Sequence, residues 1–138
     1  PHPDLQGNGF VARLSGATAE FINIWLIMCA GIRPFYLAGD ERLCLELKPV
    51  LPGWLFSSHA GEGFPEGSFA FKFLGDTLVV YHNPKRKDTF GKNAAGIKEI
   101  RLKPKKGREI KLKSPVIAAP YSYEVRRGNI ERIDIYMN

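Results

Sequence analysis

A helical segment with almost no polar surface is the feature that most constrains this chain. Residues 13–32 read RLSGATAEFINIWLIMCAGI, and Ser15 can cap a helix over residues 16–32. The helix ends before Pro34, because proline cannot continue the hydrogen-bond ladder. From residue 24 onward every side of the helix is apolar or small. A helix of this kind is either buried on all faces or spans a membrane.

The length of this helix argues against a membrane span. About 16 helical residues rise about 24 Å, whereas the apolar core of a bilayer requires about 20 residues. We therefore predict a buried helix that packs against a sheet on one side. Nothing else in the chain is predicted to cover its other side. That side is left unexplained within this chain, and an exposed apolar patch of this size rarely stays in contact with water.

The remainder of the chain has the pattern of short strands. Apolar residues alternate in RLCLELKP, which places Leu43, Leu45 and Leu47 on one face. The same alternation in SFAFKFLG places Phe69, Phe71 and Phe73 on one face. About eight or nine such strands at regular spacing are typical of an antiparallel sandwich.

Three of the predicted strand pairs are hairpins, over residues 68–84, 96–114 and 122–137. The predicted fold is mainly β: a jelly-roll-like antiparallel β-sandwich preceded by one buried N-terminal α-helix. Residues 1–34 form the lead-in and the helix, and residues 35–138 form the sandwich.

The net charge of +6 is concentrated in one segment. Residues 85–113 hold twelve Lys or Arg side chains and three acids, a pattern that can bind the phosphates of nucleic acid. However, the lysines alternate with apolar residues, as on the outer face of a strand. Phe90 is the only aromatic residue in the segment, so no base-stacking surface is predicted. Nucleic-acid binding is therefore not favoured.

The sequence gives little support for a catalytic site or a metal-binding site. His2, His59 and His82 are scattered, no metal-binding spacing occurs, and no catalytic residue can be nominated. Cys29 and Cys44 lie in apolar segments, where two buried thiols are favoured over a disulfide. We expect no metal and no cofactor. No signal peptide is visible, which predicts a cytoplasmic protein.

The start of the helix is a candidate phosphate-binding site. Ser15 supplies a hydroxyl, Gly16 leaves the backbone N–H groups accessible, and Arg13 lies two residues before Ser15. Helix N-termini bind anions through free N–H groups and the helix dipole. The alternative is an ordinary helix cap without a ligand.

Three aromatic residues are candidate sugar contacts. Trp54, Tyr81 and Tyr121 could line a carbohydrate-binding surface, because flat rings stack on the apolar faces of pyranoses. The alternative is that aromatic residues in strands belong to the core.

Three runs of the sequence recur in a recognisable order: ARLSGATAEFINIWLIMCAGIRP, then LELKPVLPGW, and later FKFLGDTLVVYHNP. Together they resemble the C-terminal end of cellobiose-phosphorylase-like enzymes, glycoside hydrolase family 94 and its relatives, and the third run is similar to the closing sheet of those enzymes. The matching positions are Ser15-Gly16, Ala19, Trp25, Gly31-Ile32-Arg33-Pro34, Leu45 to Pro49 and Leu51-Pro52-Gly53-Trp54.

This resemblance implies that the helix is the last helix of an (α/α)6 barrel and that the sandwich supports the barrel. The chain would be part of a phosphorylase or hydrolase that acts on β-linked glucosides. The family's Thr-Gly, associated with phosphate, matches Ser15 and Gly16, whereas Arg13 is added from charge and proximity alone. The general acid of the family is an upstream Asp that nothing here matches. We therefore expect no catalysis by this chain alone.

The resemblance also implies the partners of the chain. They are carbohydrate, inorganic phosphate, and either the remainder of a parent enzyme or a second copy packed on the apolar helix. A free-standing carbohydrate-binding sandwich is the alternative, and it predicts an exposed row of aromatic side chains.

Overall fold

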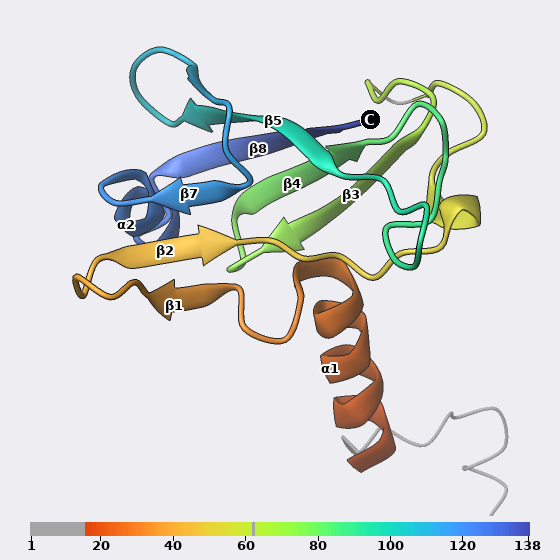
Figure 1. Ribbon diagram of the computed structural model, residues 1–138, viewed down its shortest axis with the longest axis horizontal. Helices are drawn as coiled ribbons and strands as arrows, with labels where there is room; N and C mark the ends of the chain where they lie inside the picture. Colours follow the sequence, from red (N-terminus) through yellow and green to blue (C-terminus); the bar gives the residue numbers. More distant parts are fainter. Residues whose placement is uncertain (1–15, 62) are drawn as a thin grey trace, which may run out of the picture.

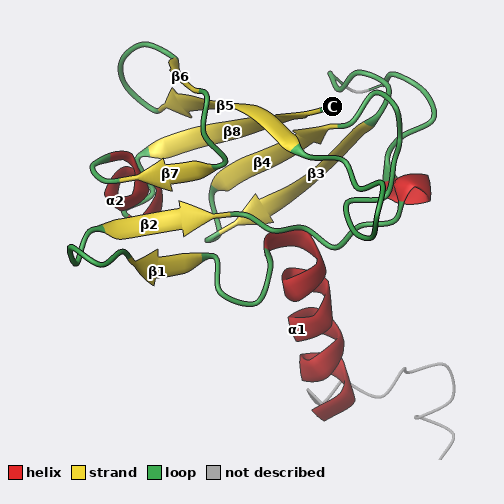
Figure 2. Ribbon diagram, in the orientation of Figure 1, coloured by secondary structure: helices red, strands yellow, loops and turns green. Residues whose placement is uncertain are grey.

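The computed structural model describes residues 16–61 and 63–138 and has a mainly β architecture in which one helix precedes two sheets (Figures 1 and 2). In chain order the elements are α1 (Gly16–Ala30), β1 (Phe35–Leu37), β2 (Leu43–Glu46), the 3-10 helix η2 (Gly53–Leu55), β3 (Ser68–Phe73), β4 (Thr77–His82), β5 (Ile97–Pro104), β6 (Ile110–Leu112), β7 (Val116–Ala118), α2 (Tyr121–Arg126) and β8 (Ile130–Met137).

The strands form two sheets that are not closed into a barrel. The smaller sheet has the order β1-β2-β7, and the larger sheet has the order β3-β4-β8-β5-β6. The predicted hairpins β3–β4 and β5–β6 are confirmed. All pairings are antiparallel except β4 with β8, which run parallel from Leu78 opposite Arg132 to His82 opposite Tyr136.

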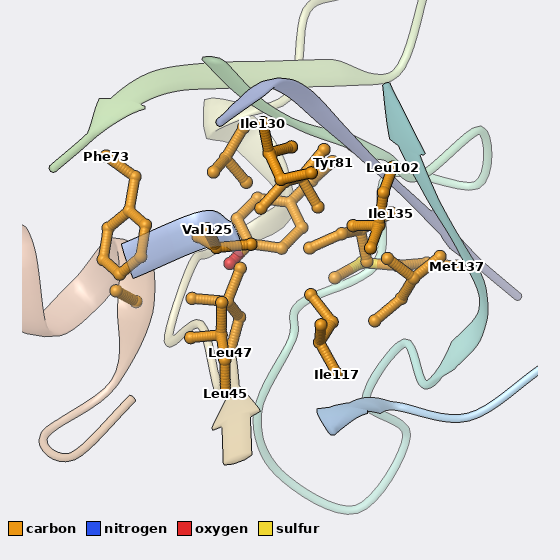
Figure 3. Close-up of a cluster of buried hydrophobic side chains, with 14 of the residues drawn as sticks. Leu45, Leu47, Phe73, Tyr81, Leu102, Ile117, Val125, Ile130, Ile135 and Met137 are labelled. Atoms are coloured by element: carbon orange, nitrogen blue, oxygen red, sulfur yellow. The ribbon is translucent and has the colours of Figure 1, made fainter. Parts of the chain in front are cut away.

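The core lies between the two sheets (Figure 3). Leu45 and Ile117 from the smaller sheet meet apolar side chains of the larger one, among them Val79, Leu102 and Ile135. All five are fully buried, as the alternation of apolar residues along the strands requires. Burial of each such side chain contributes about 1.5–3 kcal/mol, so this interior is the main source of stability.

The predicted third hairpin is wrong in its first arm. Residues 121–126 form the helix α2, and only β8 is a strand. Tyr121 and Val125 are four residues apart, so they share one face of a helix, and this face packs on the core. The hydroxyl of Ser122 donates a 2.8 Å hydrogen bond to the carbonyl of Leu43, which ties α2 to β2.

The predicted burial of the first helix is also wrong for this chain. Only Cys29 and Ala30 of α1 are buried, and the helix ends at Ala30 rather than at Ile32. Gly31 ends it with a φ of +91°, a conformation that glycine adopts without steric cost. Its N–H still donates to the carbonyl of Ile27 at 2.8 Å. Among the described residues, no helix has the length and apolarity to cross a membrane.

Candidate functional site

The helix α1 projects from the sandwich and is anchored at its last turn (Figure 1). The hydroxyl of the fully buried Tyr81 donates a 2.7 Å hydrogen bond to the carbonyl of Cys29. The N–H of Val50 donates to the carbonyl of Met28, also at 2.7 Å. The C-terminal end of the helix is therefore fixed to the core, while the preceding turns extend beyond it.

Large apolar side chains on these turns are exposed to solvent. We define the apolar helix surface as Phe21, Ile22, Ile24, Trp25 and Leu26. The side chain of Phe21 is 68% exposed, and the others are between 39% and 55% exposed. Contiguous exposed apolar surfaces of this kind mark interaction sites in soluble proteins.

An apolar hollow continues this surface at the base of the helix. It has a volume of about 460 Å³ and lies between α1 and the turn that joins β3 to β4. Leu26 and Ile27 line it from the helix, and Phe73 and Leu74 line it from the sheet. A side chain of a partner could enter this hollow while the partner covers the helix.

The candidate phosphate-binding residues fall mainly outside the described part of the chain. Arg13 and Ser15 are not described, and Gly16 is the first residue of α1. Gly16 is exposed, and a Cβ added there would meet nothing within 4 Å. Phosphate binding at this position stays a prediction.

The three candidate sugar contacts are not brought together. Trp54 is 74% exposed on η2, whereas Tyr81 is fully buried and offers no ring face to a ligand. Tyr121 lies half-buried on α2, at the opposite end of the molecule from η2 (Figure 1). Tyr81 shares the buried face of β4 with Val79, and this two-residue spacing is the signal that could have assigned it to the core.

A polar cluster on the outer face of the larger sheet was not predicted. Asp134 accepts hydrogen bonds from His82 Nε2 at 2.6 Å and from Arg132 Nη2 and Nε at 2.7 and 2.8 Å. The ring of Tyr136 stacks on His82 with centroids 4.6 Å apart. The parallel pairing of β4 with β8 creates this cluster, and pairing between distant strands is not readable from local sequence.

The charges of this cluster stabilise one another. Burial alone raises the pKa of Asp134, but hydrogen bonds from His82 and Arg132 outweigh it and hold that pKa below its ordinary value. Ser68 lies opposite His82 on β3, yet its hydroxyl has no hydrogen-bond partner within the described residues. The hydroxyl of Ser68 is therefore not bonded to His82 as a nucleophile is to its base.

The described part of the chain contains neither a reactive thiol nor a metal-binding site. Cys29 and Cys44 are free and buried, as predicted. Burial raises the pKa of Cys29 to about 11, so its thiol is protonated and unreactive at neutral pH. No group of three or more His, Cys, Asp or Glu side chains is placed to hold a metal ion among residues 16–61 and 63–138.

Scans of the chain against protein-family models, curated protein sequences and solved structures give no match. The apolar helix surface is the most distinctive functional feature that the described residues present.

Proposed function

We propose that this chain is the C-terminal β-domain of a carbohydrate-active enzyme of the phosphorylase or hydrolase type. In this proposal α1 packs against the helices of an adjoining helical barrel, and the two sheets form a jelly-roll-like sandwich that supports the barrel. The observation that carries the proposal is the apolar helix surface, which is exposed although the last turn of the same helix is buried. The resemblance of the sequence to the ends of such enzymes supplies the class of enzyme.

The energetics favour a covered helix. Full burial of one large apolar side chain contributes about 1.5–3 kcal/mol, so covering the five partly exposed ones contributes on the order of 5 kcal/mol. Glu20 is the only charged residue of α1, so little electrostatic cost opposes the burial. A helical neighbour suits this surface, because ridges of side chains on one helix fit the grooves of another.

The chemistry of the intact enzyme follows from the same proposal. Phosphate, or water in a hydrolase, attacks the anomeric carbon of a β-glucoside while an upstream carboxylic acid protonates the leaving oxygen. The present chain holds the barrel helix in place, and Arg13, Ser15 and Gly16 contact the phosphate. That phosphate contact rests on the resemblance and on the chemistry of helix N-termini.

Two measurements test the proposal. The source DNA upstream of the codon for Pro1 should continue in frame through a helical region that carries the acidic residue. A stop codon and then a separate start codon, both directly upstream of the codon for Pro1, would overturn the proposal. The isolated chain should also self-associate in light scattering across a dilution series and should not cleave disaccharides with or without phosphate. A stable monomer, or cleavage by the chain alone, would contradict it.

A free-standing carbohydrate-binding sandwich is the second candidate, and the exposed Trp54 favours it. The buried Tyr81 counts against a row of sugar-stacking rings. Calorimetric titration with cellobiose and glucose separates the two candidates. Saturable binding that is lost in Trp54→Ala supports the binding module, and the absence of binding supports the enzyme domain.

A further inference from the structure

The loop between β4 and β5 is held in one shape by hydrogen bonds from the side chains of Asn83 and Thr89. Asn83 is fully buried, and its Nδ2 donates to the carbonyl of Lys87 at 2.7 Å. Thr89 Oγ1 accepts from the N–H of Leu51 at 2.7 Å and donates to the carbonyl of Pro49 at 2.8 Å. The loop is therefore built against the segment that precedes η2, before any ligand is present.

A close backbone approach completes this support. A Cβ on Gly53 would lie 2.0 Å from the carbonyl oxygen of Arg86, so only glycine fits there. The N–H of Gly53 donates to Asp88 Oδ1 at 2.7 Å, which engages the one acid of the loop. Arg86 itself has a φ of +47°, which is costly for a residue with a side chain. Backbone strain of this kind gathers at functional sites, where the surrounding structure enforces it.

The cationic side chains of this loop outnumber its one acid, Asp88, and form no ion pair with it. We define the basic loop as residues 85–93, which contain Lys85, Arg86, Lys87 and Lys92. Within the residues that the structure describes, none of these four takes part in an ion pair. The Nε of Arg86 is buried and has no hydrogen-bond acceptor there. A buried, charged donor without an acceptor is costly, so a movement of the Arg86 side chain toward a ligand oxygen would relieve that cost.

A hollow of about 510 Å³ is formed by the basic loop itself. Arg86, Lys87 and Lys92 line it together with Phe90, whose side chain is exposed. Asp88 also lines it, and its Oδ1 accepts the hydrogen bond from Gly53. The volume falls in the range of about 300–1,000 Å³ that small-molecule sites occupy. The hollow thus combines three unpaired cationic side chains and one aromatic surface with a single carboxylate, that of Asp88.

We propose that the basic loop binds the phosphate group of a small phosphate monoester, with Phe90 against the organic part of the ligand. A guanidinium group and ammonium groups together suit the charge and the oxygen geometry of a phosphate. The proposal goes beyond the proposed function and holds whether or not α1 is covered by a barrel.

The other basic residues favour a small ligand over nucleic acid. Arg101, Lys103 and Lys105 are paired with Glu99, Glu131 and Asp76. The basic segment recognised in the sequence is therefore not a continuous unpaired stripe along which a polynucleotide backbone could lie. Lys98, Lys106, Arg108, Lys111 and Lys113 also form no ion pair among the described residues, but the hollow of the basic loop gathers Arg86, Lys87 and Lys92 around one cavity.

The first experiment is a titration of the full chain followed by amide NMR at low ionic strength. The probes are phenyl phosphate, inorganic phosphate and phenol, which lacks the phosphate. We expect saturable shifts of the amides of residues 86–93 with phenyl phosphate, weaker binding of inorganic phosphate and none of phenol. Absence of saturable binding of phenyl phosphate at millimolar concentrations would overturn the proposal, and so would equal affinity for both phosphates.

Matched variants then locate the site. Arg86→Lys keeps the charge but removes the Nε donor, and Lys92→Gln changes an exposed side chain that the fold does not need. Each should weaken the binding of phenyl phosphate by about tenfold, the effect of one lost charge-assisted hydrogen bond. The double control Lys106→Gln and Lys113→Gln removes two charges beside β6 and should leave the affinity unchanged.

Two results in the variants would overturn the proposal. One is unchanged binding in Lys92→Gln together with unchanged binding in Arg86→Lys. The other is binding of single-stranded oligonucleotides with an affinity that rises with oligonucleotide length and that falls equally in the control variant. The latter result would assign the charge to an extended nucleic-acid surface. Thermal unfolding of each variant shows whether the fold is retained.

Discussion

The hydroxyl of Tyr81 donates a 2.7 Å hydrogen bond to the carbonyl of Cys29 and so joins the centre of the sandwich to the end of α1. Because Cys29 lies in the last turn of α1, its carbonyl has no partner within the helix ladder of an ideal helix end. Tyr81 is fully buried, and its burial raises the pKa of the phenol well above the ordinary value. The phenol stays protonated and remains a donor across the physiological pH range.

Tyr81→Phe should destabilise the chain, because it leaves the buried carbonyl of Cys29 without its donor. We expect a loss of about 1–3 kcal/mol in the free energy of unfolding, measured by chemical denaturation. The control is Tyr123→Phe, since the side chain of Tyr123 is exposed and its hydroxyl makes no such bond. Equal stability of the two variants would show that the bond to Cys29 does not anchor the helix.

Replacement of Phe21 and Leu26 by Gln should abolish self-association without loss of stability. Both side chains belong to the apolar helix surface, and Phe21 is 68% exposed, so the isolated fold loses few contacts. We expect at least a tenfold increase in the dissociation constant of the oligomer, measured by light scattering on dilution. Trp54→Gln is the control, because it removes a similarly exposed ring that lies on η2 and not on α1. A mass that falls in both variants, or in neither, contradicts an interface on the helix.

Asp134→Asn should lower stability at neutral pH by about 1–3 kcal/mol, because it removes the charge to which His82 and Arg132 are bonded. The folded pKa of Asp134 is below its ordinary value of 3.8, so the ionised carboxylate favours the folded state. This contribution is fully present above the ordinary pKa and is lost as the pH falls through the lowered folded value.

The difference in melting temperature between wild type and Asp134→Asn should therefore shrink in acid, below the ordinary pKa of 3.8. Asp40→Asn serves as the control, because Asp40 pairs with Arg42 on an exposed loop where ion pairs contribute little. A difference that stays constant down to acid pH would mean that the charge of Asp134 is not what stabilises the sheet.

Gly53→Ala should disturb the basic loop, because the added methyl group would lie 2.0 Å from the carbonyl oxygen of Arg86. We expect a loss of about 1–3 kcal/mol or more in unfolding free energy, together with weaker binding of phenyl phosphate. Gly39→Ala is the matched control, since a Cβ there meets nothing within 4 Å. Retained stability and retained binding in Gly53→Ala would show that the loop does not depend on this close approach.

Local pattern was a good guide to strands whose alternation matches one buried face. The alternation in β2, β3 and β4 predicted those strands, and the turn residues between β5 and β6 predicted their hairpin. The same reasoning failed at α2, because Tyr121 and Val125 fit the buried face of a helix as well as an alternating strand.

Features that depend on distant parts of the chain were not predictable. The carbonyl of Arg86 lies against Gly53 although the two residues are more than thirty positions apart in the sequence. The sequence near either residue therefore does not predict the contact. The charges of Asp134 and His82 meet through a parallel pairing that no short motif encodes. The apolar character of α1 indicated that another surface packs against the helix. The sequence of this chain alone does not identify that packing partner.

The position of β8 has a consequence for how the chain is made. This strand lies between β4 and β5, so the centre of the larger sheet consists of residues 130–137. During synthesis on the ribosome, two hairpins emerge first, β3–β4 and β5–β6. Until β8 is made, they remain separate, and the edges of β4 and β5 that pair with β8 are unpaired. The two hairpins can join only after the last strand has been translated and released from the exit tunnel. Until then the nascent chain exposes strand edges that favour aggregation, so its yield should depend strongly on chaperones.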